Sequence, residues 1–126
     1  FELTYVDKDN KENTPFVTMW GTGSAMREWL YVDDLANACV FLMKNYDKSE
    51  ILNIGTGTDV SIKELAELVK EIVGYKGEIK WDTTKPDGMP RKLLNVDRLT
   101  NLGWKYEVPL KEGIKKTYEW YKKSYD

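Results

Sequence analysis

The sequence predicts a mixed α/β fold, α+β-like in character, in which short strands alternate with helices. Two observations support this prediction. Short segments rich in β-branched and aromatic residues are followed by longer segments whose apolar residues recur at helical spacing. The chain also has 126 residues, of which 41% are hydrophobic and 32% charged, and this length and balance suit one globular domain.

The first predicted strand is FVTMW, residues 16–20. GTGS at residues 21–24 then turns the chain, and residues 27–32 predict a second extended segment. The polar opening, residues 1–14, is expected to be a frayed or truncated start, so that the domain proper covers residues 15–126.

A helix is expected over residues 34–45, with Asp33 or Asp34 as its N-terminal cap. Its apolar residues recur at helical spacing and predict one buried face, made of Leu35, Ala36, Cys39, Val40 and Met43. Cys39 is therefore expected to be a small buried hydrophobic residue and not a reactive thiol.

The second half of the chain opens with a predicted strand at residues 51–55, and residues 61–74 are the clearest helix of the sequence. Ser61 and Glu64 have the spacing of a capping box, and Gly74 stands where helices commonly end. The apolar stripe of this helix is Ile62, Leu65, Ala66, Val69, Ile72 and Val73.

The remaining expected elements are, in order, a strand at residues 77–81, an extended segment at 91–95, a short helix at 96–104 and a final helix at 110–123. Asn95 or Asp97 lies near the start of the short helix, and Gly103 lies at its end. Pro109 is expected to start the final helix, because its missing N–H costs nothing at that position.

The composition excludes several classes of site. A single cysteine cannot form an intramolecular disulfide, and the absence of histidine excludes a Ser-His or Cys-His nucleophilic pair and argues against an ordinary zinc site. The formal net charge of −2 gives no broad attraction to nucleic acid or to an anionic membrane. No apolar run approaches the roughly 20 residues of a membrane span. These features predict a cytoplasmic globular protein.

TTKPDGMPRK, residues 83–92, combines two prolines with three cations and one carboxylate, Asp87. Proline lacks the backbone N–H and restricts the residue before it, so this segment cannot be a helix and is a poor strand. The segment is either a solvated turn, in which Asp87 pairs with its own cations, or a cradle for an anion. The residues alone leave both readings open.

Two glycine-containing segments are candidate ligand loops. In WGTGSAMRE, residues 20–28, glycine lets the backbone approach a ligand and Arg27 can bind a phosphate with two parallel hydrogen bonds. The alternative is an Arg27 paired with a neighbouring carboxylate. GTGT at residues 55–58 lacks the third glycine of a dinucleotide-binding loop, so it predicts a structural turn without a cofactor.

Three segments resemble the C-terminal part of the GDP-L-fucose synthases, a group within the extended short-chain dehydrogenase/reductase family: WGTGSAMREWLYVDDLANACVFLMKNY, LNIGTGTDVSIKELAELVKEIVGYKGEIKWDTTKPDGMPRKLLNVDRLTNLGW and LKEGIKKTYEWY. The resemblance runs over residues 15–121. R-E-x-L-x-V-D-D and N-I-G-T-G are widespread in the extended family, whereas KPDGMPRKLLN is particular to this group and its nearest relatives.

The resemblance implies a substrate domain whose Rossmann part is absent from this chain. Enzymes of this group convert GDP-4-keto-6-deoxy-D-mannose to GDP-L-fucose by inverting C3 and C5 and reducing C4 with NADPH. Their N-terminal Rossmann domain binds NADP(H) and carries the catalytic residues, and the full-length enzyme is expected to be a homodimer. This chain is accordingly expected to be a fragment with no turnover of its own, no cofactor or metal, and no nucleic-acid or membrane partner.

The same resemblance implies substrate contacts at Trp20, Arg27 and Asp87, with Arg91 and Lys92 close by. Arg27 would bind the diphosphate, and Trp20 would line the nucleotide-sugar cleft with its indole. Asp87 would accept hydrogen bonds from a sugar or ribose hydroxyl or from the base. Lys92 would add positive charge near the diphosphate.

Two other functions stay open. The chain could be the substrate domain of another extended reductase or epimerase acting on a different nucleotide sugar, or a stand-alone, non-catalytic nucleotide-sugar-binding domain. Trp29 and Tyr31 stand where many relatives have Phe and His, so the fine shape of the cleft is expected to differ from theirs.

Overall fold

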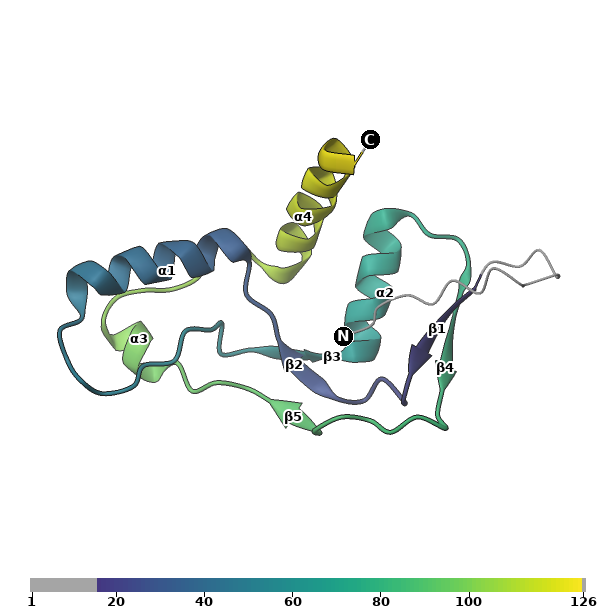
Figure 1. The fold of residues 1–126 in the computed structure, drawn as a ribbon, viewed down its shortest axis with the longest axis horizontal. Coiled ribbons are helices and arrows are strands. Elements are labelled where there is room, and N and C mark those ends of the chain that lie inside the picture. The colour runs from purple at the N-terminus through teal and green to yellow at the C-terminus, as the bar shows by residue number, and fades with distance from the viewer. Residues whose placement is uncertain (1–15, 126) are drawn as a thin grey trace. The chain divides into compact units, whose positions relative to one another are not determined.

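The structure is a computed structural model, and it describes residues 16–125. The prediction for residues 1–14 lies outside the described residues. The elements alternate as the sequence predicts and confirm a mixed α/β fold (Figure 1). They are, in order, β1 Phe16–Trp20, β2 Met26–Glu28, α1 Val32–Asn45, β3 Asp59–Ser61, α2 Ile62–Val73, β4 Glu78–Asp82, β5 Arg91–Lys92, α3 Asp97–Asn101 and α4 Leu110–Tyr125.

The chain divides into two compact units. Among the described residues, the first unit holds 16–26 and 60–91, and the second holds 27–59 and 92–125. Strands β2, β3 and β5 form a three-stranded sheet in the order β3-β2-β5. That residues 15–126 form one domain stays a prediction.

In the first unit, β1 and β4 form a parallel pair, in a register that runs from Phe16 opposite Glu78 to Trp20 opposite Asp82. Both strands are confirmed close to their predicted bounds. Because parallel strands end at the same edge, the loops that follow β1 and β4 leave the pair side by side.

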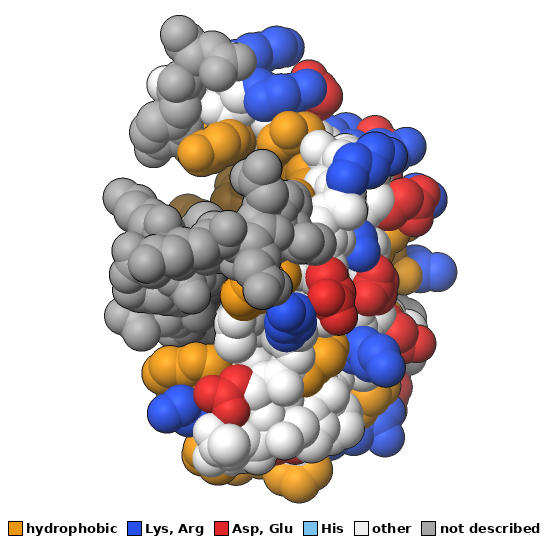
Figure 2. Space-filling view, turned by 90° about the vertical axis from the view of Figure 1, so that its right-hand side faces the viewer, with side chains coloured by type: hydrophobic (Ala, Val, Ile, Leu, Met, Phe, Trp, Pro, Cys, Tyr) orange, Lys and Arg blue, Asp and Glu red, His pale blue; other side chains and the backbone are white. Residues whose placement is uncertain are grey.

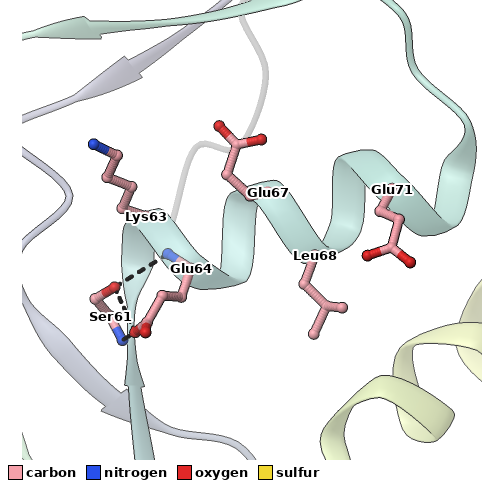
Figure 3. Close-up of a pocket in the computed structure, with 6 residues that line it drawn as sticks. All are labelled: Ser61, Lys63, Glu64, Glu67, Leu68 and Glu71. Carbon is pink, nitrogen blue, oxygen red and sulfur yellow. Dashed lines mark hydrogen bonds between the residues drawn. The ribbon is translucent and has the colours of Figure 1, made fainter.

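Helix α2 of the same unit begins and ends as the sequence predicts. The N–H of Glu64 donates to Ser61 Oγ over 3.1 Å, and the N–H of Ser61 donates to Glu64 Oε2 over 2.8 Å, which confirms the capping box (Figure 3). Gly74 ends the helix in the left-handed conformation with φ 72°. The N–H groups of Ile62 and Lys63 donate to Ala25 O and Gly23 O over 3.0 and 2.9 Å and fasten the helix to the residues after β1.

The core of the second unit is formed by Ala38, Leu99 and Trp104, with half-buried apolar residues around them: Leu30, Phe41, Leu42, Leu52, Ile54 and Tyr106. The indole N–H of Trp104 donates to Asn37 Oδ1 over 3.0 Å. Asp34 is buried, and its Oδ2 accepts the N–H of Val108 over 2.9 Å. Helix α1 therefore packs through a side that contains a carboxylate and an alanine.

The predicted buried face of α1 is wrong. Leu35, Val40 and Met43 are 43%, 51% and 86% exposed, and Ala36 and Cys39 are also exposed. The helix is rotated because Asp34 satisfies backbone N–H groups of residues 107 and 108, while Ala38 is small enough to let large core residues approach. Cys39 is consequently not a core residue.

The predicted start of α1 is also wrong. The helix begins at Val32, and its cap residue is Tyr31, whose side chain makes no capping hydrogen bond. Neither predicted aspartate caps the helix. Asp33 and Asp34 both lie in its first turn, where a carboxylate still interacts favourably with the helix dipole.

Three other elements differ from the predictions in extent. The extended segment after the first turn is a strand only over β2, and residues 51–55 form no strand. The carbonyl of Ile51 instead accepts from the guanidinium of Arg98 over 3.0 Å, and Asn53 Nδ2 donates to the carbonyl of Asn95 over 3.1 Å. The segment 91–95 is a strand only at β5, which comprises Arg91–Lys92.

Both C-terminal helices lie where they are predicted. The N–H at the start of α3, on Asp97, donates to Asn95 Oδ1 over 2.9 Å, and Gly103 follows the helix with φ 97°. Helix α4 begins directly after Pro109, whose carbonyl accepts the N–H of Gly113 over 2.9 Å. Over the part of the chain that the structure describes, every helix is too short or too polar to cross a membrane.

Candidate functional site

The carboxyl edge of the β1–β4 pair brings two predicted ligand segments together. The glycine turn, residues 21–24, follows β1, and the prolyl loop, residues 83–90, follows β4. The N–H of Gly21 donates to Asp82 O over 2.9 Å and ties the first residue of the turn to the last residue of the neighbouring strand. Ligands commonly bind beyond the carboxyl ends of parallel strands, so this edge is the candidate site.

Asp87 joins the two loops. Its Oδ1 accepts the backbone N–H of Thr22 over 2.8 Å, and its Oδ2 accepts the Thr22 hydroxyl over 2.7 Å. The hydroxyl oxygens of Thr22 and Ser24 lie 2.8 Å apart, and the N–H of Ser24 donates to Thr22 Oγ1 over 3.2 Å. The carboxylate of the prolyl loop thus engages the glycine turn, a pairing that neither sequence reading anticipated.

Both glycines of the turn are structurally required. Gly21 and Gly23 have φ values of 80° and 75°, in the left-handed region that side chains rarely adopt. A Cβ on Gly21 would collide with the carboxylate of Asp87, and a Cβ on Gly23 would lie 2.6 Å from the indole ring of Trp81. The turn can therefore pack closely against the prolyl loop and against Trp81 of β4 only with glycine at both positions.

Hydrogen bonds also hold both ends of the prolyl loop. The N–H of Lys85 donates to Asp82 O over 3.2 Å, and the N–H of Met26 donates to Pro90 O over 2.8 Å. The hydroxyl of Thr84 donates to Asp82 Oδ1 over 2.5 Å. The loop is consequently fastened at its start, near its middle through Asp87, and at its end.

The two carboxylates of this edge are ionised at neutral pH. The hydroxyl of Thr22, and then its backbone N–H, lower the pKa of Asp87 below its ordinary value. The hydroxyl and then the N–H of Thr84 lower the pKa of Asp82 in the same way. The main contacts of both carboxylates are with neutral donors, and the positive charge of Lys85 adds a smaller lowering of the Asp82 pKa.

Trp20 is the last residue of β1 and directly precedes the glycine turn. Its side chain is 65% exposed, and Lys85 Nζ lies 5.5 Å from the centre of its ring. An exposed indole beside an ammonium group offers a flat stacking surface together with a positive charge. This combination suits a ligand that has both a planar base and phosphate groups.

The five predicted site residues are divided between the units. Trp20, Asp87 and Arg91 belong to the first unit, and Arg27 and Lys92 belong to the second. Within the first unit, Trp20 and Asp87 lie on adjoining segments because Asp87 contacts Thr22. Arg27 is half-buried in the middle of β2, whereas Arg91 and Lys92 are exposed in β5. That Arg27 and Lys92 share a site with the other three stays a prediction.

Sequence reasoning missed Glu28. Its Oε1 accepts the N–H groups of Thr56 and Gly57, the latter over 2.7 Å, and its Oε2 accepts the N–H of Leu94 over 2.9 Å. A Cβ on Gly55 would collide with this carboxylate. Glu28 therefore holds the GTGT turn in shape by accepting hydrogen bonds from its backbone N–H groups. The only available signal was a glycine-rich turn whose backbone N–H groups needed an acceptor.

A surface hollow beside α2 does not fit an anionic ligand. It is lined by Ser61, Lys63, Glu64, Glu67, Leu68 and Glu71, and Figure 3 shows these side chains directed to both sides of the helix. Three carboxylates and one ammonium group would repel a diphosphate. Figure 2 shows cationic and anionic side chains interspersed over the face in view, in accord with the formal net charge of −2.

Comparison with known proteins gives one consistent relationship. Residues 5–55 match the NAD dependent epimerase/dehydratase family. The "Putative GDP-L-fucose synthase 2" of Arabidopsis thaliana is 59% identical over 109 residues, which are 86% of this chain and 33% of that protein. The chain thus spans about a third of the length of this curated relative.

Solved structures show the same partial correspondence. A GDP-6-OMe-4-keto-L-xylo-heptose reductase from C. jejuni superposes with a TM-score of 0.81 at 44% identity, over 86% of this chain and 34% of that one. A GDP-L-fucose synthetase from Naegleria fowleri gives a TM-score of 0.82 at 26% identity, over 87% of this chain and 34% of that one. The chain therefore matches the C-terminal part of the GDP-L-fucose synthases and has the fold of that part of the extended short-chain dehydrogenase/reductases.

Proposed function

We propose that this chain is the GDP-sugar-binding part of a GDP-L-fucose synthase, an oxidoreductase and isomerase that uses NADPH. The observation that carries the proposal is the carboxyl edge of β1 and β4, where the glycine turn and the prolyl loop KPDGMP are joined by Asp87 and Thr22. The similarity to GDP-L-fucose synthases supports the choice of nucleotide sugar.

The proposed ligand contacts are the residues that the resemblance implies, and the chemistry of each side chain suits its proposed role. Trp20 provides an exposed aromatic face for the nucleotide sugar. Arg27 has the planar guanidinium that binds a diphosphate with two parallel hydrogen bonds, and Arg91 and Lys92 add exposed positive charge. Asp87 belongs to the site as the carboxylate of the prolyl loop.

The complete reaction requires groups that the proposal assigns to another domain. The substrate is GDP-4-keto-6-deoxy-D-mannose, and its conversion to GDP-L-fucose combines epimerisation at C3 and C5 with reduction at C4. We assign NADP(H) binding and the catalytic residues to an N-terminal Rossmann domain of the same enzyme, which would be a cytoplasmic homodimer. The present chain contributes substrate binding and no turnover of its own.

Calorimetric titration of the chain with GDP, UDP and dTDP tests this proposal. GDP is expected to bind more tightly than either pyrimidine nucleotide. Equal affinities for all three would favour a site that reads only the diphosphate, and tighter binding of UDP or dTDP would identify a different nucleotide-sugar enzyme. The absence of binding by all three nucleotides would contradict the proposal.

A further inference from the structure

We propose that Thr22 is a positioning residue of the GDP-sugar site, and that Asp87 acts by holding the prolyl loop to Thr22 and not by contacting the nucleotide sugar. This inference rests on the proposed function, because it concerns how the same site is organised. The observation behind it is that one threonine engages both oxygens of the carboxylate, through its backbone N–H and through its hydroxyl.

The contact joins segments that are 65 residues apart in sequence. The prolyl loop is bound at its start through Lys85 N–H and at its end through Pro90 O. Asp87 lies between these two anchors. Its contact with Thr22 therefore restricts the middle of the loop, where Pro86 already limits the backbone conformations available.

The hydroxyl of Thr22 is oriented by its neighbours. A hydroxyl has one proton, and the carboxylate Oδ2, 2.7 Å away, is the stronger acceptor. The hydroxyl oxygen of Ser24 lies 2.8 Å from Thr22 Oγ1, and the Ser24 side chain also hydrogen-bonds to Asp87. The contact with Asp87 Oδ2 thus uses the single proton of the Thr22 hydroxyl and requires a hydroxyl at residue 22.

The position of Lys85 links this contact to ligand binding. Lys85 is two residues before Asp87, and its Nζ lies over the ring of Trp20. Releasing Asp87 from Thr22 would let the cationic part of the loop move relative to the indole. An anionic Asp87 would itself repel a diphosphate, so its favourable contribution is expected to come from loop geometry.

A double-mutant cycle on GDP binding tests the inference. The variants are Thr22→Val, Asp87→Asn and the double variant, with Thr22→Ser retaining the hydroxyl and Thr100→Val, on α3, as a matched control. Thr22→Val and Asp87→Asn are each expected to weaken GDP binding by about three- to tenfold. The double variant is expected to bind GDP no more weakly than either single variant. Thr22→Ser and Thr100→Val are expected to bind GDP with the affinity of the parent.

Amide hydrogen exchange without ligand provides a readout that does not depend on the nucleotide. Exchange at residues 84–89 is expected to be faster in Thr22→Val than in Thr22→Ser. Faster exchange without any GDP binding by the parent would contradict the proposed function while supporting the Thr22–Asp87 link. Unchanged GDP affinity in Thr22→Val, or a further loss when Asp87→Asn is added to it, would overturn the positioning role.

Discussion

Trp20 lies opposite Asp82 at the last position of the parallel β1–β4 pair. The two loops that carry the candidate site both begin immediately after this pair of residues, and the N–H of Gly21 donates to Asp82 O. The register of one short parallel pair therefore determines which residues of the glycine turn meet which residues of the prolyl loop. A shift by one residue would turn the Trp20 side chain to the other face.

Gly23→Ala is expected to destabilise the protein more than Gly74→Ala. Both glycines have similar positive φ values, 75° and 72°, so each alanine variant is expected to have a similar backbone strain of about 1–3 kcal/mol. Only Gly23 is packed against Trp81, whereas a Cβ on Gly74 would meet nothing within 4 Å. Urea denaturation of both variants measures the difference. Equal losses of unfolding free energy would show that the contact with Trp81 contributes nothing.

Glu28→Gln is expected to lower the free energy of unfolding by about 1–3 kcal/mol. The carboxylate offers two acceptor oxygens to the surrounding N–H groups, whereas the amide of glutamine offers one. The affected donors are the N–H groups of Thr56, Gly57 and Leu94. Glu67→Gln, on the exposed side of α2, is the matched control. A Glu28→Gln variant as stable as this control would disprove the organising role of Glu28.

Asp87 is expected to make stability depend on acid pH. Its pKa in the folded protein is lowered from an ordinary value of 3.8 by the hydrogen bonds from Thr22. The contribution of Asp87 to the free energy of unfolding is therefore complete above its pKa in the unfolded state. This contribution is lost as pH falls through its pKa in the folded state. Asp87→Asn is expected to be less stable than the parent at neutral pH, with a difference that narrows below pH 3.8.

Chemical denaturation at a series of pH values measures this narrowing. Asp47→Asn, which changes another exposed carboxylate, provides the comparison for the general effect of removing a charge. A stability difference between the parent and Asp87→Asn that stays constant into acid would contradict the assigned cause of the pKa shift.

Cys39 is expected to react with a thiol reagent in the native protein. The structure places it on the exposed side of α1, contrary to the sequence prediction of a buried residue. Its modification rate in buffer should approach the rate measured in denaturant. A rate that rises by orders of magnitude only on unfolding would show that this side of the helix is covered.

Local signals in the sequence were sufficient where the interactions are local. The capping box of Ser61 and Glu64 and the left-handed Gly74 depend on residues within one helix, so α2 was predicted closely. The buried side of α1 depends on Asp34 meeting the N–H groups of residues 107 and 108, more than 70 positions later. Apolar spacing alone could not reveal that a carboxylate would occupy the buried side.

The candidate site shows the same division. Composition identified the prolyl loop and the glycine turn as special, because proline, glycine and clustered cations carry recognisable conformational and electrostatic constraints. The Thr22–Asp87 and Glu28–Gly57 contacts were missed, because each joins a common polar residue to a distant loop. Such pairs become visible only when the strands bring their loops together.

Titration of the 126-residue chain with GDP, followed by tryptophan fluorescence, tests the central claim most directly. We expect saturable quenching or enhancement for the parent and for Arg98→Ala, a control arginine that is exposed on α3. Arg27→Ala is expected to bind GDP about tenfold more weakly or worse, through loss of charge-assisted hydrogen bonds. No saturable response in the parent, or equal GDP affinity in Arg27→Ala and Arg98→Ala, would contradict the proposed role of this chain in binding a GDP-sugar.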